Sequence, residues 1–343
     1  MNFASDNVTG AAPEILAALG AQNTGSLMPY GNDDVTRTAE TKVAGVFETD
    51  ADVFIVATGT ASNSLALATL TPPWGAIFCH QVAHVYDTEC GGPEFFSGGA
   101  KMLPIDGDDG KFTSEALDTA INASGVGNTH HCQAACVSIT QATETGSLYR
   151  LDEIAAISGV CKAHGLKLHM DGARFANAVA ALGCSAADTS WKAGVDILSF
   201  GATKNGALAA EAVVLFDKSL AEEFAFRRKR GGHLFSKMRL LSVQMDAYVT
   251  DDLWLKNAAQ ANANAVRMAE GLDTIDGVSQ TQSVQANILF TELPRAVIDG
   301  LKADGHLFYE RGGDNVIRLV LAFNTPAKDI DAFIAAARSH AES

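Results

Sequence analysis

The feature that most constrains the fold is an alternation of short apolar runs with helical stretches between residues 53 and 216. We predict strands at the apolar runs, residues 53–57, 76–79, 101–105, 134–139, 166–170, 195–200 and 212–216. Helices are predicted between several of them, at residues 62–70, 113–123, 151–164 and 173–182. Strands separated by helices favour βαβ units. We therefore expect an α/β fold with a mostly parallel central sheet and helices on both faces.

The pattern changes after residue 217. Residues 218–271 are helical in pattern, with a break at Gly231-Gly232. Beyond residue 277 we predict strands at 287–292, 306–309 and 316–321, and helices at 294–303 and 328–340. These elements form a small C-terminal α+β domain. A chain of 343 residues is long enough for two domains, and we expect a large domain at residues 1–250, including the N-terminal segment, and a small one at 251–343.

The composition excludes several classes of protein. The 25 basic against 40 acidic residues give a net charge of −15, which disfavours nucleic acids and anionic membranes as partners. The apolar runs are far shorter than the roughly 20 residues that span a bilayer, and the first six residues do not resemble a signal peptide. The six cysteines include no C-x-x-C pair, so reduced thiols and a cytoplasmic location are expected.

Two charged residues follow predicted strands at the edge where open α/β sheets bind ligands. Lys204 lies between glycines in Gly201-Ala202-Thr203-Lys204-Asn205-Gly206, and Asp171 ends the strand that contains His169. A lysine there can form a Schiff base, and an acid can pair with a cofactor ring nitrogen. The alternatives are a solvated loop lysine and an aspartate that caps a helix. Together the two residues favour pyridoxal phosphate chemistry.

Two further segments are candidates for a binding site. Thr58-Gly59-Thr60-Ala61-Ser62-Asn63 joins a strand to a helix, where free N–H groups and the helix dipole favour phosphate; an ordinary capped turn is the alternative. His84 follows a strand and can stack on a planar cofactor or transfer a proton; a half-buried structural histidine is the alternative. His130-His131-Cys132 fits no zinc signature, so no metal site is expected.

Over nearly its full length, the sequence resembles the low-specificity L-threonine aldolases, which are fold type I pyridoxal phosphate enzymes. It is most similar to the branch that includes phenylserine aldolases. The segments that carry the resemblance are Phe3-Ala4-Ser5-Asp6-Asn7, Tyr30-Gly31-Asn32-Asp33-Asp34, Gly59-Thr60-Ala61-Ser62-Asn63, Ala83-His84, His169-Met170-Asp171-Gly172-Ala173-Arg174 and Lys204.

The resemblance implies a role for each matching residue. Lys204 would hold pyridoxal 5'-phosphate covalently, Asp171 would pair with its ring nitrogen, and His84 would stack on the ring and handle the substrate's β-hydroxyl proton. The resemblance also implies that Gly59, Thr60 and the backbone at Ala61 bind the phosphate. Ser5, Arg174 and Arg318 would bind the substrate carboxylate. Tyr30 would line the site of a neighbouring subunit. Arg174 is also counted among the cofactor-binding residues.

The implied reaction is retro-aldol cleavage of L-threonine, L-allo-threonine or phenylserine to glycine and an aldehyde, by an aldehyde-lyase that assembles as a homotetramer. The alternatives are a β-eliminating lyase acting on another small amino acid, or a non-catalytic relative. A nicotinamide oxidoreductase is disfavoured because no G-x-G-x-x-G follows a strand.

Two segments depart from the family pattern. Thr143 stands where many relatives have a second histidine, and residues 230–235 replace a glycine-rich segment with a nearby arginine. These departures leave open the stereochemical preference at the hydroxyl carbon and any phosphate or subunit contact from residues 230–235. The preferred aldehyde and the identity of the catalytic base also stay open.

Overall fold

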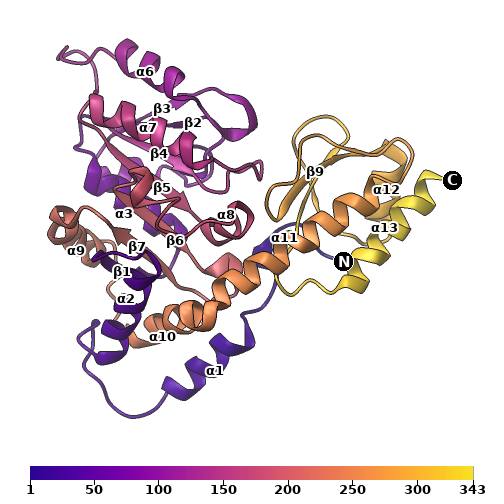
Figure 1. Cartoon of the computed structure of the whole chain (residues 1–343), viewed down its shortest axis with the longest axis horizontal. Helices are drawn as coiled ribbons and strands as arrows, with labels where there is room; N and C mark the ends of the chain where they lie inside the picture. Colours follow the sequence, from indigo (N-terminus) through magenta and orange to yellow (C-terminus); the bar gives the residue numbers. More distant parts are fainter. Residues whose placement is uncertain (343) are drawn as a thin grey trace.

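The computed structural model describes residues 1–342, and a seven-stranded sheet forms the centre of the larger domain (Figure 1). The strands are β1 (Asp52–Val56), β2 (Gly75–His80), β3 (Lys101–Ile105), β4 (Gln133–Thr140), β5 (Lys167–Gly172), β6 (Ile197–Gly201) and β7 (Glu211–Leu215). Their order is β1-β7-β6-β5-β4-β2-β3, and β7 is antiparallel to both of its neighbours while the pairs from β6 to β3 are parallel. The mostly parallel sheet predicted from the sequence is confirmed.

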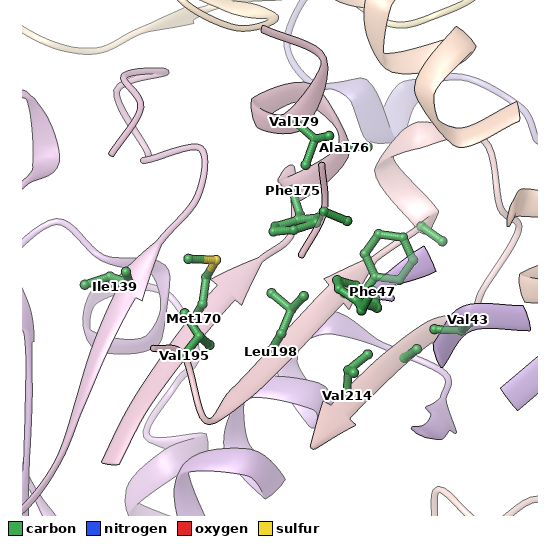
Figure 2. Close-up of a cluster of buried hydrophobic side chains, with 14 of the residues drawn as sticks. Val43, Phe47, Ile139, Met170, Phe175, Ala176, Val179, Val195, Leu198 and Val214 are labelled. Carbon is green, nitrogen blue, oxygen red and sulfur yellow. The ribbon is translucent and has the colours of Figure 1, made fainter. Parts of the chain in front are cut away.

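Apolar side chains on both faces of this sheet explain why helices cover each face. Leu198 and Val214 point to a core that includes Phe47 and Phe175 (Figure 2). Their chain neighbours Ile197 and Val213 lie in a second cluster on the other face, because successive side chains of a strand alternate. The first core is covered by α1 (Pro13–Gln22), α2 (Asp34–Val46), α6 (Ser114–Ala123), α7 (Leu151–Ala163), α8 (Phe175–Leu182) and α10 (Arg239–Val249), and the second by α3 (Gly59–Leu70) and α9 (Ala221–Arg230).

The smaller domain is built on a four-stranded antiparallel sheet in the order β10-β11-β9-β8. Its elements are β8 (Ser279–Gln280), β9 (Ile288–Glu292), α12 (Arg295–Ala303), β10 (Tyr309–Glu310), β11 (Val316–Val320) and α13 (Ala327–Ala341). The strand predicted at 306–309 is wrong for most of its length, since pairing with β11 begins only at Tyr309. The N–H of Leu307 instead donates to the carbonyl of Met1, and its carbonyl accepts from Phe3.

The N-terminal residues therefore lie with the smaller domain. Phe3 is fully buried there, its ring 5.2 Å from that of Phe333, and its carbonyl accepts the N–H of Val320. The long helix α11 (Leu253–Leu272) runs between the two domains (Figure 1). Trp254 belongs to the core of the larger domain and Met268 to that of the smaller one. One rigid helix thus belongs to both cores.

The fold gathers several loops at one edge of the large sheet. The carboxyl ends of β4, β5 and β6 meet there, beside the amino end of α3 and the turn between β6 and β7. Between β2 and β3, two short helices, α4 (His84–Asp87) and α5 (Gly92–Ser97), follow β2. Within residues 1–342, every helix is too short or too polar to be a candidate for crossing a membrane.

Candidate active site

A cavity of about 390 Å³ opens at this edge of the sheet and brings together most of the predicted cofactor-binding residues. Segments that are distant in the sequence contribute to it, because the parallel strands end side by side. Its lining residues include Asn7, Thr58, Gly59, Thr60, Ser62, Asn63, His84, Glu89, Asp171, Ser199, Lys204 and Glu211.

Lys204 lies in a single 3-10 turn, Thr203–Asn205, that begins two residues after β6. The next side chain, Asn205, donates to the hydroxyl of Tyr248 and to the carbonyl of Trp254, both at 2.8 Å. Gly206 then ends the turn at φ +118°, a backbone conformation that other residues rarely adopt. The turn is therefore anchored on both sides of the lysine, which lies half-buried in the cavity.

Asp171 is buried near the end of β5, and both of its carboxylate oxygens have a donor. The Ala173 N–H donates to Oδ1 at 3.0 Å, and the Asn63 amide donates to Oδ2 at 2.9 Å. These two bonds hold the carboxylate in one orientation. A carboxylate held in this way can pair with a cationic ring nitrogen in the cavity.

Glu89 connects the Asp171 side of the cavity with His84. Its Oε1 lies 3.0 Å from His84 Nδ1 and accepts from the same Asn63 amide at 2.9 Å. The hydrogen bond to Glu89 raises the pKa of His84. Burial raises the pKa of Glu89, although the bonds from His84 and Asn63 favour its ionised form. Because Nδ1 is bonded to Glu89, Nε2 is the nitrogen of His84 that is left for a substrate.

The amino end of α3 has the features of an anion site. Thr58 caps the helix by accepting the N–H of Ala61 at 3.2 Å. Gly59 and Thr60 line the cavity, and as the first two residues of the helix their N–H groups have no partner within it. The hydroxyl of Ser62 is buried in the same wall without a hydrogen-bond partner. The helix dipole adds a partial positive charge here. Because Ala61 already donates to Thr58, Gly59, Thr60 and Ser62 are the better donors for a phosphate.

The arginines predicted to bind a carboxylate lie beside the cavity rather than in its lining. Arg174 is buried in a bidentate pair with Asp6, at 2.7 and 2.9 Å. Arg318, which is 8% exposed, has no carboxylate within 4 Å among residues 1–342, and its Nε has no hydrogen-bond partner. Burial, together with the charge of Arg174, lowers the pKa of Arg318 to about 10. An unpaired cation in such a place favours a bound anion.

Three other predicted residues have different surroundings. Tyr30 lies outside this cavity, is half exposed, and has the Lys229 ammonium 4.5 Å from its ring centre. Ser5 caps the turn Asp6–Val8 by accepting the Asn7 N–H. Thr143, in the position of the second histidine of many relatives, is fully buried with its hydroxyl bonded to Asp109 and Ser147.

Sequence reasoning did not single out Glu89 or Glu211, which both line the cavity. Glu89 follows His84 by five residues and Glu211 begins β7. Neither spacing matches a pattern that predicts a contact. The one available signal was the position of Glu211, a charged residue at the start of an otherwise apolar strand.

Comparisons with known proteins agree on one family for this chain. Residues 2–294 match the family model described as beta-eliminating lyase. The low specificity L-threonine aldolase of Pseudomonas aeruginosa is 45% identical over 324 residues, which cover 94% of this chain and 93% of that protein. The enzyme of the same name from a Pseudomonas species is 43% identical over the same shares of both chains.

The solved structures extend the agreement to the fold. A threonine aldolase from Leishmania major superimposes with a TM-score of 0.92, at 28% identity and over 99% of both chains. A serine palmitoyltransferase from Sphingomonas wittichii, at 16% identity and a TM-score of 0.74, shares the fold. The protein therefore belongs to the beta-eliminating lyase family and, within it, to the low specificity L-threonine aldolases.

Proposed function

We propose that this protein cleaves L-threonine, L-allo-threonine and related β-hydroxy-α-amino acids such as phenylserine into glycine and an aldehyde. The observation that carries the proposal is the convergence of Lys204, Asp171 and the His84–Glu89 pair on one cavity. The family implies pyridoxal 5'-phosphate as cofactor.

The residues of the cavity fit this cofactor. When bound, pyridoxal phosphate acts as an electron sink for the bond broken at the amino acid's α-carbon. Lys204 would hold it covalently, and Gly59, Thr60 and the unpartnered Ser62 hydroxyl would bind its phosphate. Asp171, oriented by Asn63, would keep the ring nitrogen protonated.

Arg318 is the best candidate to bind the substrate carboxylate, because it is buried, its Nε has no hydrogen-bond partner, and no carboxylate of residues 1–342 lies within 4 Å of it. Guanidinium groups bind carboxylates in a bidentate geometry. Arg174 is already paired with Asp6, so we assign it a positioning role beside the carboxylate pocket. Ser5 and Arg318 complete that pocket.

We assign His84 the role of accepting the β-hydroxyl proton. Glu89 holds Nδ1, which leaves Nε2 for the hydroxyl, either directly or through a water. A general base of this kind contributes roughly 10²–10⁴ in rate. Loss of that proton allows the carbonyl of the aldehyde to form as the bond between the α- and β-carbons breaks.

We further propose that the protein acts as a cytoplasmic homotetramer in which Tyr30 reaches a neighbouring subunit's site. Exposed aromatic side chains support an interface: Phe95, 78% exposed, and Phe226, 71% exposed, line one groove between α5 and α9. Sedimentation of the active enzyme tests the assembly, and a fully active monomer would contradict it.

The activity is tested by measuring glycine and acetaldehyde released from L-threonine, with pyridoxal phosphate added. We expect equal amounts of both products from the native protein and none from Lys204→Ala. L-allo-threonine and phenylserine, tested in parallel, rank the substrates. Ammonia and a keto acid in place of glycine would favour the alternative, a β-eliminating lyase.

A further inference from the structure

Glu211 is a buried carboxyl group in the cavity for which the proposed reaction has no role so far. It is the first residue of β7, 6% exposed, and pairs with Gly201 at the end of β6 and with Val56 of β1. Because β7 is antiparallel to β6, its first residue lies at the edge of the sheet where Lys204 lies. Acidic side chains are almost never fully buried unless they are paired.

The contacts of Glu211 are with the turn that carries Lys204. Its Oε2 accepts the Ala202 N–H at 2.6 Å, two residues before the lysine. Thr203 also donates to the carboxylate. Burial raises the pKa of Glu211 to about 7, while these bonds and the charge of Lys204 favour the ionised form. The remaining titratable group that faces it is the Tyr248 hydroxyl, from α10.

The other acidic groups near Lys204 have partners of their own. Asp6, whose pKa the charge of Lys204 helps to lower, is bound to Arg174 and Asn287. Asp171 is bound to Asn63 and the backbone. His84, the other titratable group that faces Lys204, is bound to Glu89. Among the acidic residues of 1–342 that line this cavity, Glu211 is the one that binds the residues immediately before Lys204 in the sequence.

We propose that Glu211 is a positioning residue for Lys204: its carboxylate fixes residues 202 and 203, at the start of the turn that carries the lysine, and is the buried counter-ion of the lysine ammonium. This inference rests on the proposed function of Lys204. When Lys204 is not bonded to the cofactor, its free amine can take up a proton, and the resulting charge would be costly in this partly buried position without a partner. Glu211 compensates that charge and keeps the amine directed at the cofactor.

The test separates the charge of Glu211 from its hydrogen bond. Glu211→Gln keeps an oxygen that can accept the Ala202 N–H but removes the charge, whereas Glu211→Asp keeps the charge with a shorter reach. Gln244→Leu is a matched control. The Gln244 amide oxygen carries no charge but also holds the segment between β6 and β7, by accepting the N–H groups of Leu208 and Ala209.

The measurement is the initial rate at which pyridoxal phosphate attaches to the cofactor-free protein between pH 6 and 9. Samples are reduced with borohydride, and the modified peptide is quantified by mass. Attachment needs the neutral amine, and a nearby carboxylate stabilises the ammonium. We therefore expect the half-maximal rate of Glu211→Gln at a lower pH than that of the native protein.

Glu211→Asp should keep the native pH dependence with a lower rate, and Gln244→Leu should change only the rate. An unchanged pH dependence in Glu211→Gln, or equal shifts in Glu211→Gln and Gln244→Leu, would overturn the inference while native attachment at Lys204 still supports the proposed function. Failure of the native protein to attach the cofactor at Lys204 at any pH would overturn both.

Discussion

Replacing Glu89 with Gln tests how the acidic neighbour of His84 contributes to proton transfer. The two side chains are 3.0 Å apart, and the Glu89 side chain is fully buried, so solvent screens this contact little. A hydrogen bond to a charged group contributes about 1.5–3 kcal/mol, against about 0.5–1.5 for a neutral one. The difference of about 1–2 kcal/mol corresponds to a fall in kcat/KM of about 5- to 30-fold.

The same substitution moves the pH dependence in a defined direction. The bond to Glu89 raises the pKa of His84, and His84 accepts a proton only when it is neutral. The native rate therefore falls, as pH decreases, at a higher pH than it would without Glu89. In Glu89→Gln the acid limb of kcat/KM moves to lower pH, although the maximum is smaller.

The assay is kcat/KM for L-threonine between pH 5.5 and 9, with Ser64→Ala as a matched control. Ser64 donates to the other carboxylate oxygen of Glu89 at 3.4 Å, a long bond, and carries no charge, so its loss should change kcat/KM less than Glu89→Gln does and leave the acid limb in place. An acid limb of Glu89→Gln that stays in place, or moves to higher pH, would refute the reasoning.

Three further substitutions probe the charges around the cavity. Arg318→Met removes a buried cation that lacks a counter-ion, so thermal unfolding should occur at an equal or higher temperature while KM for the amino acid rises about 10- to 150-fold; an unchanged KM would remove Arg318 from the carboxylate pocket. Asp171→Asn should lower kcat by about 10²-fold or more and weaken cofactor binding, both measured after titration with pyridoxal phosphate; near-native turnover would contradict the role of Asp171 at the ring nitrogen. Asp6→Asn leaves Arg174 buried without its partner and should lower the free energy of unfolding by about 3–5 kcal/mol in urea. Burial raises the pKa of Asp6, but the charges of Arg174 and Lys204 outweigh it and hold that pKa below its ordinary value. The native protein should therefore exceed the variant in free energy of unfolding by the full amount at neutral pH, and by less as acidification protonates Asp6. A difference that grows towards low pH would contradict this pair.

The sequence predicted the strands of the large sheet well because each is a continuous apolar run. It did not indicate the direction of β7, because a strand that is buried on both faces has the same apolar pattern whether it pairs in parallel or antiparallel. The connection between β6 and β7, residues 202–210, nevertheless contained a usable signal. A parallel crossover needs about a dozen residues or more, so this short connection favours an antiparallel pair.

The smaller domain shows where local patterns are insufficient. Residues 306–308 have the composition of a strand, but the chain that pairs with them is the N-terminus, about 300 residues away. Phe3 therefore packs on Phe333 in the smaller domain. Pairings between distant segments depend on tertiary packing, which a pattern within one window does not contain.

The candidate site divides in the same way. Lys204, Asp171 and Gly59 could be predicted because each lies at a strand end or helix start, positions that the topology places at one edge. Glu89 and Glu211 could not, because their roles depend on which side chains face them across the cavity. For Arg318, the sequence resemblance suggested the role, and its unpartnered, buried Nε supplies the physical reason.

The most direct test of the central claim is the location of the cofactor bond. The native protein is saturated with pyridoxal phosphate, reduced with borohydride, digested and mapped by mass, with Lys204→Ala treated identically. We predict one modified residue, Lys204, in the native protein and no modified peptide in the variant. A native adduct at another lysine, or none at any lysine, would contradict the account.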